Sequence, residues 1–511
     1  MSAFADALGR VPPLLASHVT VSAAALALGL LIALPLAVWS ARRPGVARAA
    51  LGFASLVQTI PGLALLALFY PLLLWLSGLV GGGVPALGFL PSLLALTLYA
   101  LLPILRNAVA GLTGIDPGVR EAADAVGMTG WQTLRLVEAP LALPVAVAGI
   151  RTAAVWTIGA ATLSTTVGYP GLGDLIFAGL QTQAWALVLA SCLAAAALAL
   201  SVDALIGSIE RGLATRRRWL AIGAAAVLAL GTLVATAPRW AAGGGGRTVV
   251  IGAKNFSEQF ILARLIGQRL ERAGYQVSYR DGLGSAVAFG AVSSGAIDVY
   301  VEYAGTVWGG AMGRRDAPPR EVMLPAIGRW AAGRGVDMVG ALGFENAYAF
   351  AMTAERARTL GIRTLADLAA HSAQLTLGSD LEFLDRPEWA AVARAYGFRF
   401  AGTRRYSPTF MYRALASGEA DVISAFSSDG RIAADRLAVL ADPRHAVPGY
   451  DAILLVGPSR AGDARLLAAL RPLVGRVTVD AMRAANWQVD RDTGKRTPDE
   501  AARSLATRLG R

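Results

Sequence analysis

Apolar positions divide the chain into two parts of different character. A segment of about 20 apolar residues is long enough to cross a bilayer, and six such segments lie before residue 240. Their approximate bounds are 19–40, 50–76, 91–112, 141–166, 183–206 and 219–238. The second contains Pro61 and Pro71 and the third contains Pro103, which predicts kinked helices whose neighbours re-satisfy the freed carbonyls. The first part is therefore expected to be a polytopic α-helical membrane domain.

After residue 246 the pattern changes to short apolar runs that alternate with amphipathic stretches. Buried strands are predicted at 248–252, 276–280 and 297–302. An amphipathic helix capped by Ser257 is predicted at 257–273. Strands alternating with helices over this length indicate an α/β domain, which we expect to have two lobes. Gly243–Gly246 is a flexible tether by composition.

Charge sets the expected orientation of the spans. Arginines gather in the loops 41–49 and 207–218 and in the loop around residues 120–135, whereas the loops 77–90 and 167–182 contain no Lys or Arg. By the positive-inside rule the arginine-bearing loops are cytoplasmic and the amino terminus is outside. The last span, preceded by arginines and ending in Ala235–Ala237, also imitates a signal peptide with cleavage after Ala237. Because Pro238 opposes that cut, we favour an uncleaved anchor.

Composition argues against catalysis and nucleic-acid binding. The chain has one cysteine, Cys192, and three histidines without metal-ligand spacing, so we expect no metal site and no cofactor. It has neither a Walker A loop nor a nucleophile elbow. The formal charge of +12 comes largely from arginines, and in the first part these lie in short loops. That placement favours a role in membrane topology over binding of nucleic acid.

A short polar stretch between the third and fourth spans carries the clearest motif. Asp116 is expected to cap a helix whose first residue is Pro117, and Gly127 then lets the chain turn. The run Glu121-Ala122-Ala123-x3-Gly127, followed by Val137-x-Ala139-Pro140, resembles the cytoplasmic coupling loop of ABC importer permeases. The resemblance implies that a separate ATPase subunit docks here, through Glu121, Ala122, Ala123, Gly127 and Pro140. Taken alone, a glutamate early in a helix is ordinary dipole chemistry.

The second part resembles the binding proteins of importers for quaternary-ammonium osmoprotectants. The resemblance rests on the runs 252–259, 282–285, 297–306, 346–349, 382–387, 425–430 and 448–451, which follow in the same order. It implies a MetI-like ABC permease, fused to a type II periplasmic binding protein. The expected domains are a permease at 1–212 with about five spans, a sixth span and linker at 213–246, and the binding domain at 247–511. Its first lobe would comprise 247–346 and 450–511, and its second lobe 347–449.

The ligand chemistry implied is simple. A trimethylammonium group has no hydrogen-bond donor, so proteins hold it by cation–π contact with aromatic rings. Tyr303, Tyr348 and Tyr450 are the candidate rings, with Phe426 behind them. Tyr300 faces the other side of its strand from Tyr303. Polar candidates for a ligand carboxylate or hydroxyl are Asn255, Ser285, Thr306, Asn346, Ser427, Ser428 and Arg386. For the rings the alternative role is core packing; for the polar groups it is turn or cap formation, or, for Arg386, a surface position.

The sequence therefore predicts a transporter subunit rather than an enzyme: a multi-pass inner-membrane permease with a tethered extracytoplasmic binding domain. The expected partners are membrane lipid, a second copy of the permease, two ATPase subunits and a small quaternary-ammonium ligand. Glycine betaine, choline, carnitine and proline betaine fit, and ergothioneine is the alternative because similar fused proteins import it. A ligand sensor would need a cytoplasmic output domain, for which the loops are too short. A channel independent of ATP would leave the coupling-loop pattern unexplained.

Overall fold

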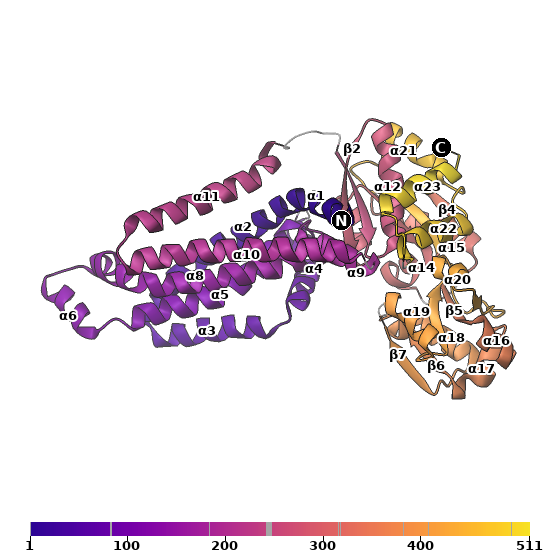
Figure 1. Ribbon diagram of the computed structural model, residues 1–511, viewed down its shortest axis with the longest axis horizontal. Coiled ribbons are helices and arrows are strands. Elements are labelled where there is room, and N and C mark those ends of the chain that lie inside the picture. Colours follow the sequence, from indigo (N-terminus) through magenta and orange to yellow (C-terminus); the bar gives the residue numbers. More distant parts are fainter. Residues whose placement is uncertain are drawn as a thin grey trace. The chain divides into compact units, whose positions relative to one another are not determined.

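The computed structural model describes residues 2–81, 84–182, 184–241, 248–314, 316, 318–381, 383–406, 408–491 and 493–510. The chain forms two compact units. The amino-terminal unit comprises Met1–Phe177 and Trp185–Gly245, and the carboxy-terminal unit comprises Ala178–Ala184 and Gly246–Arg511. Figure 1 labels many of the helices and strands of each unit. The Gly-rich tether predicted at 243–246 lies outside the described residues.

The described residues of the amino-terminal unit form helices joined by short turns and loops, with no strand among them. Among these residues, six helices are long and apolar enough to cross a membrane, which agrees with the six apolar segments. The helices up to the tether are α1 (Ser2–Gly9), α2 (Val11–Arg42), α3 (Pro44–Thr59), α4 (Gly62–Leu79), α5 (Phe89–Thr113), α6 (Pro117–Ala125), α7 (Gly130–Thr133), α8 (Ala139–Ala160), α9 (Leu172–Thr182), α10 (Trp185–Ala214) and α11 (Arg218–Ala241). The residues of α9 after Phe177 are assigned to the other unit. A π-helical turn, Leu134–Glu138, precedes α8, and a 3-10 turn, Ala161–Val167, follows it.

The second predicted span is not one kinked helix. The chain forms two helices there, α3 and α4, because Ile60 and Pro61 adopt extended backbone angles between them. A residue that precedes proline is disfavoured in the helical region, so the break falls at Ile60. Pro71 and Pro103, by contrast, lie inside α4 and α5, which continue past them.

The stretch 167–182, predicted as a loop, contains a helix. Helix α9 begins at Leu172, and its residues Leu172 and Leu175 are buried. Asp174 in its first turn accepts a hydrogen bond from Thr165 Oγ1 at 2.5 Å. The absence of Lys and Arg from this segment predicted only on which side of the membrane it lies. It gave no information on secondary structure.

The carboxy-terminal unit is built on two five-stranded sheets, as the alternating pattern predicts. The first has the order β2-β1-β3-β10-β4 and the second β7-β6-β8-β5-β9. In each sheet three neighbouring strands are parallel, and a fourth strand pairs antiparallel with the third and with the edge strand. The antiparallel strand is in each case the one that follows a crossing from the other sheet: β5 after residues 346–347, and β10 after the segment 440–450.

The strands are β1 (Thr248–Lys254), β2 (Gln276–Leu283), β3 (Val299–Tyr303), β4 (Asp337–Glu345), β5 (Tyr348–Thr353), β6 (Thr376–Ser379), β7 (Gly402–Arg405), β8 (Val422–Phe426), β9 (Leu437–Val439) and β10 (Asp451–Val456). The helices are α12 (Ser257–Arg272), α13 (Ser285–Ser293), α14 (Ala304–Thr306), α15 (Arg320–Ala332), α16 (Ala354–Leu360), α17 (Leu365–His371), α18 (Pro387–Tyr396), α19 (Pro408–Ser417), α20 (Gly430–Ala434), α21 (Ala464–Leu470), α22 (Val479–Asp490) and α23 (Pro498–Arg508).

One predicted helix cap is wrong. The N-cap of α12 is Phe256, and no side chain caps it. Ser257 is instead the first helical residue, and its hydroxyl donates to Asp490 Oδ1 at 2.5 Å. The Ser257 hydroxyl, which the local sequence predicted as the cap of α12, is therefore bound by Asp490 of α22 instead.

Candidate functional site

Helix α6 and the turn after it have the local structure that the motif predicts. Asp116 is the N-cap, and its Oδ1 accepts a hydrogen bond from the Gly118 amide at 2.8 Å. Pro117 occupies the first helical position, where its missing N–H leaves no bond unmade. Gly127 has a φ of +76°, which L side chains rarely adopt, so the chain turns at the residue that the motif reserves for glycine.

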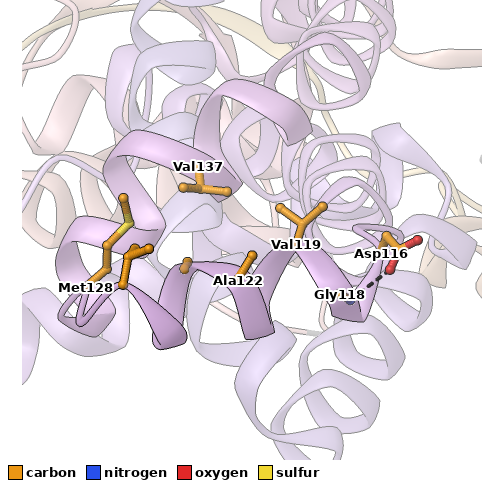
Figure 2. Close-up of a pocket in the computed structure, with 8 residues that line it drawn as sticks. Asp116, Gly118, Val119, Ala122, Met128 and Val137 are labelled. Carbon is orange, nitrogen blue, oxygen red and sulfur yellow. Dashed lines mark hydrogen bonds between the residues drawn. The ribbon is translucent and has the colours of Figure 1, made fainter.

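An apolar groove of about 560 Å³ lies along this helix. Figure 2 shows Val119 and Ala122 on one wall, with Met128 at the end and Val137 on the opposite side. Its lining is Asp116, Gly118, Val119, Ala122, Ala123, Val126, Met128 and Val137. Positions 119, 122, 123 and 126 share one helix face because residues three and four apart are neighbours. Of the motif residues, Ala123 is buried, whereas Glu121, Ala122, Gly127 and Pro140 are exposed.

Large apolar side chains near the groove are unusually accessible. Val126 is 72 % exposed, Trp131 69 % and Leu136 61 %. Val126 lies in the connection between α6 and α7, whereas Trp131 and Leu136 lie at the start of the helical stretch Gly130–Val167, which is long and apolar enough to cross a membrane. Apolar exposure of this kind is typical of a protein interaction surface.

A buried glutamate that sequence reasoning passed over connects this region to the bundle. Glu138, on the π-helical turn, is 4 % exposed and accepts hydrogen bonds from Arg42 and Arg120, both at 2.8 Å. Arg42 ends α2 and Arg120 belongs to α6, so one carboxylate joins three segments. Arg120 also donates to the carbonyl of Leu112 in α5. The only signal in the sequence was the presence of arginines nearby, which had been assigned to membrane topology.

In the carboxy-terminal unit, three of the four candidate rings meet. Tyr348 lies at the start of β5, with its ring centroid 4.9 Å from that of Phe426 and 6.2 Å, edge-on, from that of Tyr450. Phe383, which sequence reasoning did not select, is closer still, at 4.5 Å. We call these four residues the aromatic cluster. Tyr348 and Phe426 are register partners on β5 and β8, and Tyr450 immediately precedes β10 of the other sheet.

A glycine permits the close approach of Tyr450. A Cβ atom on Gly305 would lie 2.5 Å from Cε2 of the Tyr450 ring, well inside van der Waals contact. The glycine between Ala304 and Thr306 therefore lets the ring pack on the backbone. The close packing of Tyr450 is the physical reason for glycine at position 305, which the sequence identified only as part of a motif.

Tyr303 belongs to a different set of contacts. Its hydroxyl donates to Glu258 Oε1 at 2.6 Å, and its ring stacks on Phe256 at 6.1 Å. Glu258 is 3 % exposed and also accepts hydrogen bonds from Asn346 Nδ2 and Asn486 Nδ2, at 3.1 and 3.0 Å. Burial raises the pKa of Glu258, against the hydrogen bonds that these neighbours and Ser428 donate to it. Tyr303, Asn346 and Ser428, all candidate ligand residues, therefore surround a protein carboxylate.

The remaining polar candidates are dispersed. Asn255 is exposed and Thr306 is partly buried. Ser427, which follows β8, binds the first crossing segment, because its hydroxyl donates to the Glu345 carbonyl and accepts from the Ala347 amide, both at 3.0 Å. The side chain of Ser285 lies outside the described residues. Arg386 places its guanidinium carbon 5.9 Å from the centroid of the Tyr348 ring, beside the aromatic cluster.

These two units define a class of protein: a helical membrane permease joined to a two-lobed binding domain. Residues 247–507 match the family described as the substrate binding domain of ABC-type glycine betaine transport systems. Residues 26–215 match the family described as the inner membrane component of binding-protein-dependent transport systems. The chain belongs to this family of ABC import systems, with permease and binding domain in one polypeptide. Both families are transport components rather than enzymes, and membership implies a partner ATPase subunit and a small-molecule ligand.

Individual relatives match either most of the chain or one part of it. The chain is 28 % identical over 472 residues to the ergothioneine transport permease/ergothioneine binding protein of Helicobacter pylori (strain G27), covering 89 % of this chain and 82 % of the relative. It is 40 % identical over 194 residues to a glycine betaine/carnitine/choline transport system permease protein of Bacillus subtilis (strain 168), covering 38 % of this chain and 84 % of the relative. A solved structure of a glycine betaine/carnitine/choline ABC transporter aligns with a TM-score of 0.46 at 26 % identity, covering 51 % of this chain and 98 % of that one.

Proposed function

We propose that this importer carries a quaternary-ammonium compound and that the aromatic cluster binds its trimethylammonium head. The observation that carries the proposal is the meeting of Tyr348, Phe383, Phe426 and Tyr450 where the chain passes between the two sheets. Each ring face contributes roughly 0.5–2 kcal/mol to binding of such a cation. Four rings at the upper end of this range would supply about 8 kcal/mol, which corresponds to micromolar affinity.

Glycine betaine, choline, carnitine and proline betaine are the proposed ligands, with ergothioneine as the second candidate. The second candidate is favoured by one observation: the relative named for ergothioneine has both parts in one chain and aligns with 89 % of this one. All these compounds share the trimethylated or dimethylated nitrogen that the cluster would hold. Arg386, close to Tyr348, is the proposed partner of a ligand carboxylate.

We infer that the partner ATPase docks on the coupling loop. The apolar groove along α6, together with exposed Val126, Trp131 and Leu136, supports this assignment. The charge pattern supports a cytoplasmic position for this loop and an external amino terminus. We propose an inner-membrane complex of two copies of this chain with two ATPase subunits. The proposed domains remain 1–212, 213–246 and 247–511, with lobe boundaries near 346 and 450.

The test is equilibrium ligand binding to the full chain in detergent. The cluster is expected to bind at least one of the proposed ligands with micromolar or tighter affinity. Tyr348→Leu keeps most of the ring's volume but removes its π face, and it should weaken binding by about 10- to 30-fold, from the loss of roughly 1.5–2 kcal/mol.

A matched control is Phe410→Ala, because Phe410 is 50 % exposed and lies in the same unit. It should bind the ligand as the unmodified chain does. Binding that survives Tyr348→Leu unchanged would rule out the cluster as the site, and failure to bind any of the ligands would rule out the proposed cargo.

A further inference from the structure

Glu388 lies at the aromatic cluster, although it is not among the candidate residues predicted from the sequence. It belongs to the first turn of α18 and is only 6 % exposed. Its Oε1 accepts a hydrogen bond from the hydroxyl of Tyr450. The interaction holds that phenol in its protonated form, and burial together with the neighbouring Glu388 raises the pKa of Tyr450 above its usual range.

The second oxygen of the same carboxyl group is the unusual feature. Glu388 Oε2 is buried and has no hydrogen-bond partner within the described part of the chain. Leaving a buried polar atom without a partner costs about 1–3 kcal/mol, and more for a charged one, so such atoms are rare in native proteins. An unmatched acceptor of this kind indicates that something else supplies the donor.

The position of Glu388 relates the oxygen to the proposed ligand. The carboxyl group of Glu388 contacts the cluster through Tyr450. The Tyr450 ring lies edge-on to the Tyr348 ring, with 6.2 Å between the two centroids. A Cβ atom built on Gly309 would lie 3.9 Å from Glu388 Oε1, so this backbone also comes close to the carboxyl group. Gly309 follows β3 of the first sheet, whereas Glu388 lies between β6 and β7 of the second sheet, so the two come from different parts of the chain. The carboxyl group therefore lies at the junction where a ligand head would be held.

An ionised carboxylate only accepts hydrogen bonds. A trimethylammonium group offers no donor, and glycine betaine has none elsewhere, since its other group is a carboxylate that Glu388 would repel. A hydroxyl or a ring N–H on the ligand would satisfy Oε2.

We propose that Glu388 determines specificity by accepting a hydrogen bond from the ligand, so that the site takes quaternary-ammonium compounds that also carry an O–H or N–H donor and discriminates against glycine betaine. The inference rests on the proposed function, because it assumes that the aromatic cluster is the ligand site. It narrows the cargo to the chemical class that contains choline, carnitine and ergothioneine. A hydrogen bond to a charged group contributes about 1.5–3 kcal/mol, which corresponds to roughly 10- to 150-fold in affinity.

The experiment compares ligands on the full chain in detergent, by calorimetry. On the unmodified protein, choline is compared with propyltrimethylammonium, in which a methyl group replaces the hydroxyl at nearly constant shape. The hydroxyl compound should bind at least 10-fold more tightly, and at least one donor-bearing ligand should exceed glycine betaine by a similar factor. This comparison needs no mutation, so it holds even if a variant fails to fold.

The matching variant is Glu388→Gln, measured with four ligands: choline, carnitine, propyltrimethylammonium and glycine betaine. It should weaken binding of the donor-bearing ligands at least 10-fold, and it should leave binding of glycine betaine and propyltrimethylammonium unchanged or tighter. Glu355→Gln is the control, since Glu355 also lies in the first turn of a helix, α16, but is exposed. It should alter none of the affinities.

Two results would overturn the assignment. If Glu388→Gln weakens the binding of all four ligands equally, the residue supports the fold of the site and does not determine ligand specificity. If choline and its methyl analogue bind the unmodified protein equally, the oxygen selects nothing, although the proposed function would stand. Absence of binding by all four ligands and by ergothioneine would instead refute the proposed function, and this inference with it.

Discussion

Two buried carboxyl groups of the carboxy-terminal unit have environments that the local sequence did not reveal. Asp490, the last residue of α22, accepts the Ser257 hydroxyl at 2.5 Å. Burial, with the Asp429 carboxylate nearby, raises the pKa of Asp490 to about 7, against the opposing effects of Ser257, Lys495 and Arg431. Burial likewise raises the pKa of Asp429. The folded unit therefore holds protons that the unfolded chain releases.

A pH dependence of stability follows from Asp490. Its ordinary pKa is 3.8 and its folded value is about 7. Between these values the folded state binds more protons, so the free energy of unfolding should fall as pH rises from about 4 to 7 and then level off, by no more than roughly 4 kcal/mol. Urea unfolding of residues 247–511 at a series of pH values measures it.

Asp490→Asn should flatten this slope, because the amide oxygen still accepts from Ser257 while the titrating group is gone. Asp480→Asn on the same helix is the control, since Asp480 is 87 % exposed and should leave the slope as it was. A slope that persists in Asp490→Asn would assign the pH dependence to another group, such as Glu258 or Asp429.

At the scale of elements, the contact between α6 and the bundle determines how a docked subunit could act on the spans. Helix α6 has only 9 residues, too short to be stable alone. Its attachment through Arg120 to Glu138, and through Glu138 to Arg42 of α2, supplies tertiary support. Motion imposed on α6 would therefore reach α2 and the start of α8.

Glu138→Gln should separate transport from ligand binding. Losing the carboxylate leaves Arg42 and Arg120 without their shared partner, and we expect the transport rate to fall roughly fivefold or more, within the usual range of coupling energies. The measurement is ligand uptake by proteoliposomes that contain the chain and its ATPase. Ligand affinity in detergent should not change.

Glu210→Gln provides a comparison, since Glu210 is in the same unit and contacts Arg151 only at 3.6 Å, with partly exposed side chains. It should transport at the normal rate. Equal losses in both variants would indicate general destabilisation of the membrane unit, and an unaffected Glu138→Gln would show that the ion pairs do not transmit motion.

At the scale of the whole molecule, the fusion itself has a consequence. The tether that composition predicts at Gly243–Gly246 would hold the binding domain near its permease at an effective concentration in the millimolar range. If residues 1–246 and 247–511 are produced as two chains, uptake should fall sharply at micromolar binding domain and recover as its concentration approaches the millimolar range. Full activity of the separated chains at micromolar concentration would show that tight docking, rather than the tether, joins the parts.

Much of this protein could be predicted because its determinants are local. Membrane spans depend on the length of apolar runs, and the cap at Asp116 and the turn at Gly127 depend on neighbouring backbone. The break at Ile60 and the helix α9 were missed, the first because proline effects vary with context and the second because missing charge says nothing about helicity. Ser257 was misassigned because a tertiary acceptor, Asp490, competes with the helix end.

The sequence by itself determined the division into a membrane part and an α/β part, the transporter family and the coupling motif, since these rest on periodicity, composition and residue order. Only the tertiary structure decided which side chains meet. It brought Tyr348, Phe426 and Tyr450 together with Phe383 and placed Tyr303 on Glu258. It also buried Glu388 beside Tyr450 with one oxygen unmatched. Contacts between residues distant in sequence depend on how sheets and helices pack, and the pattern along a single chain does not contain that information.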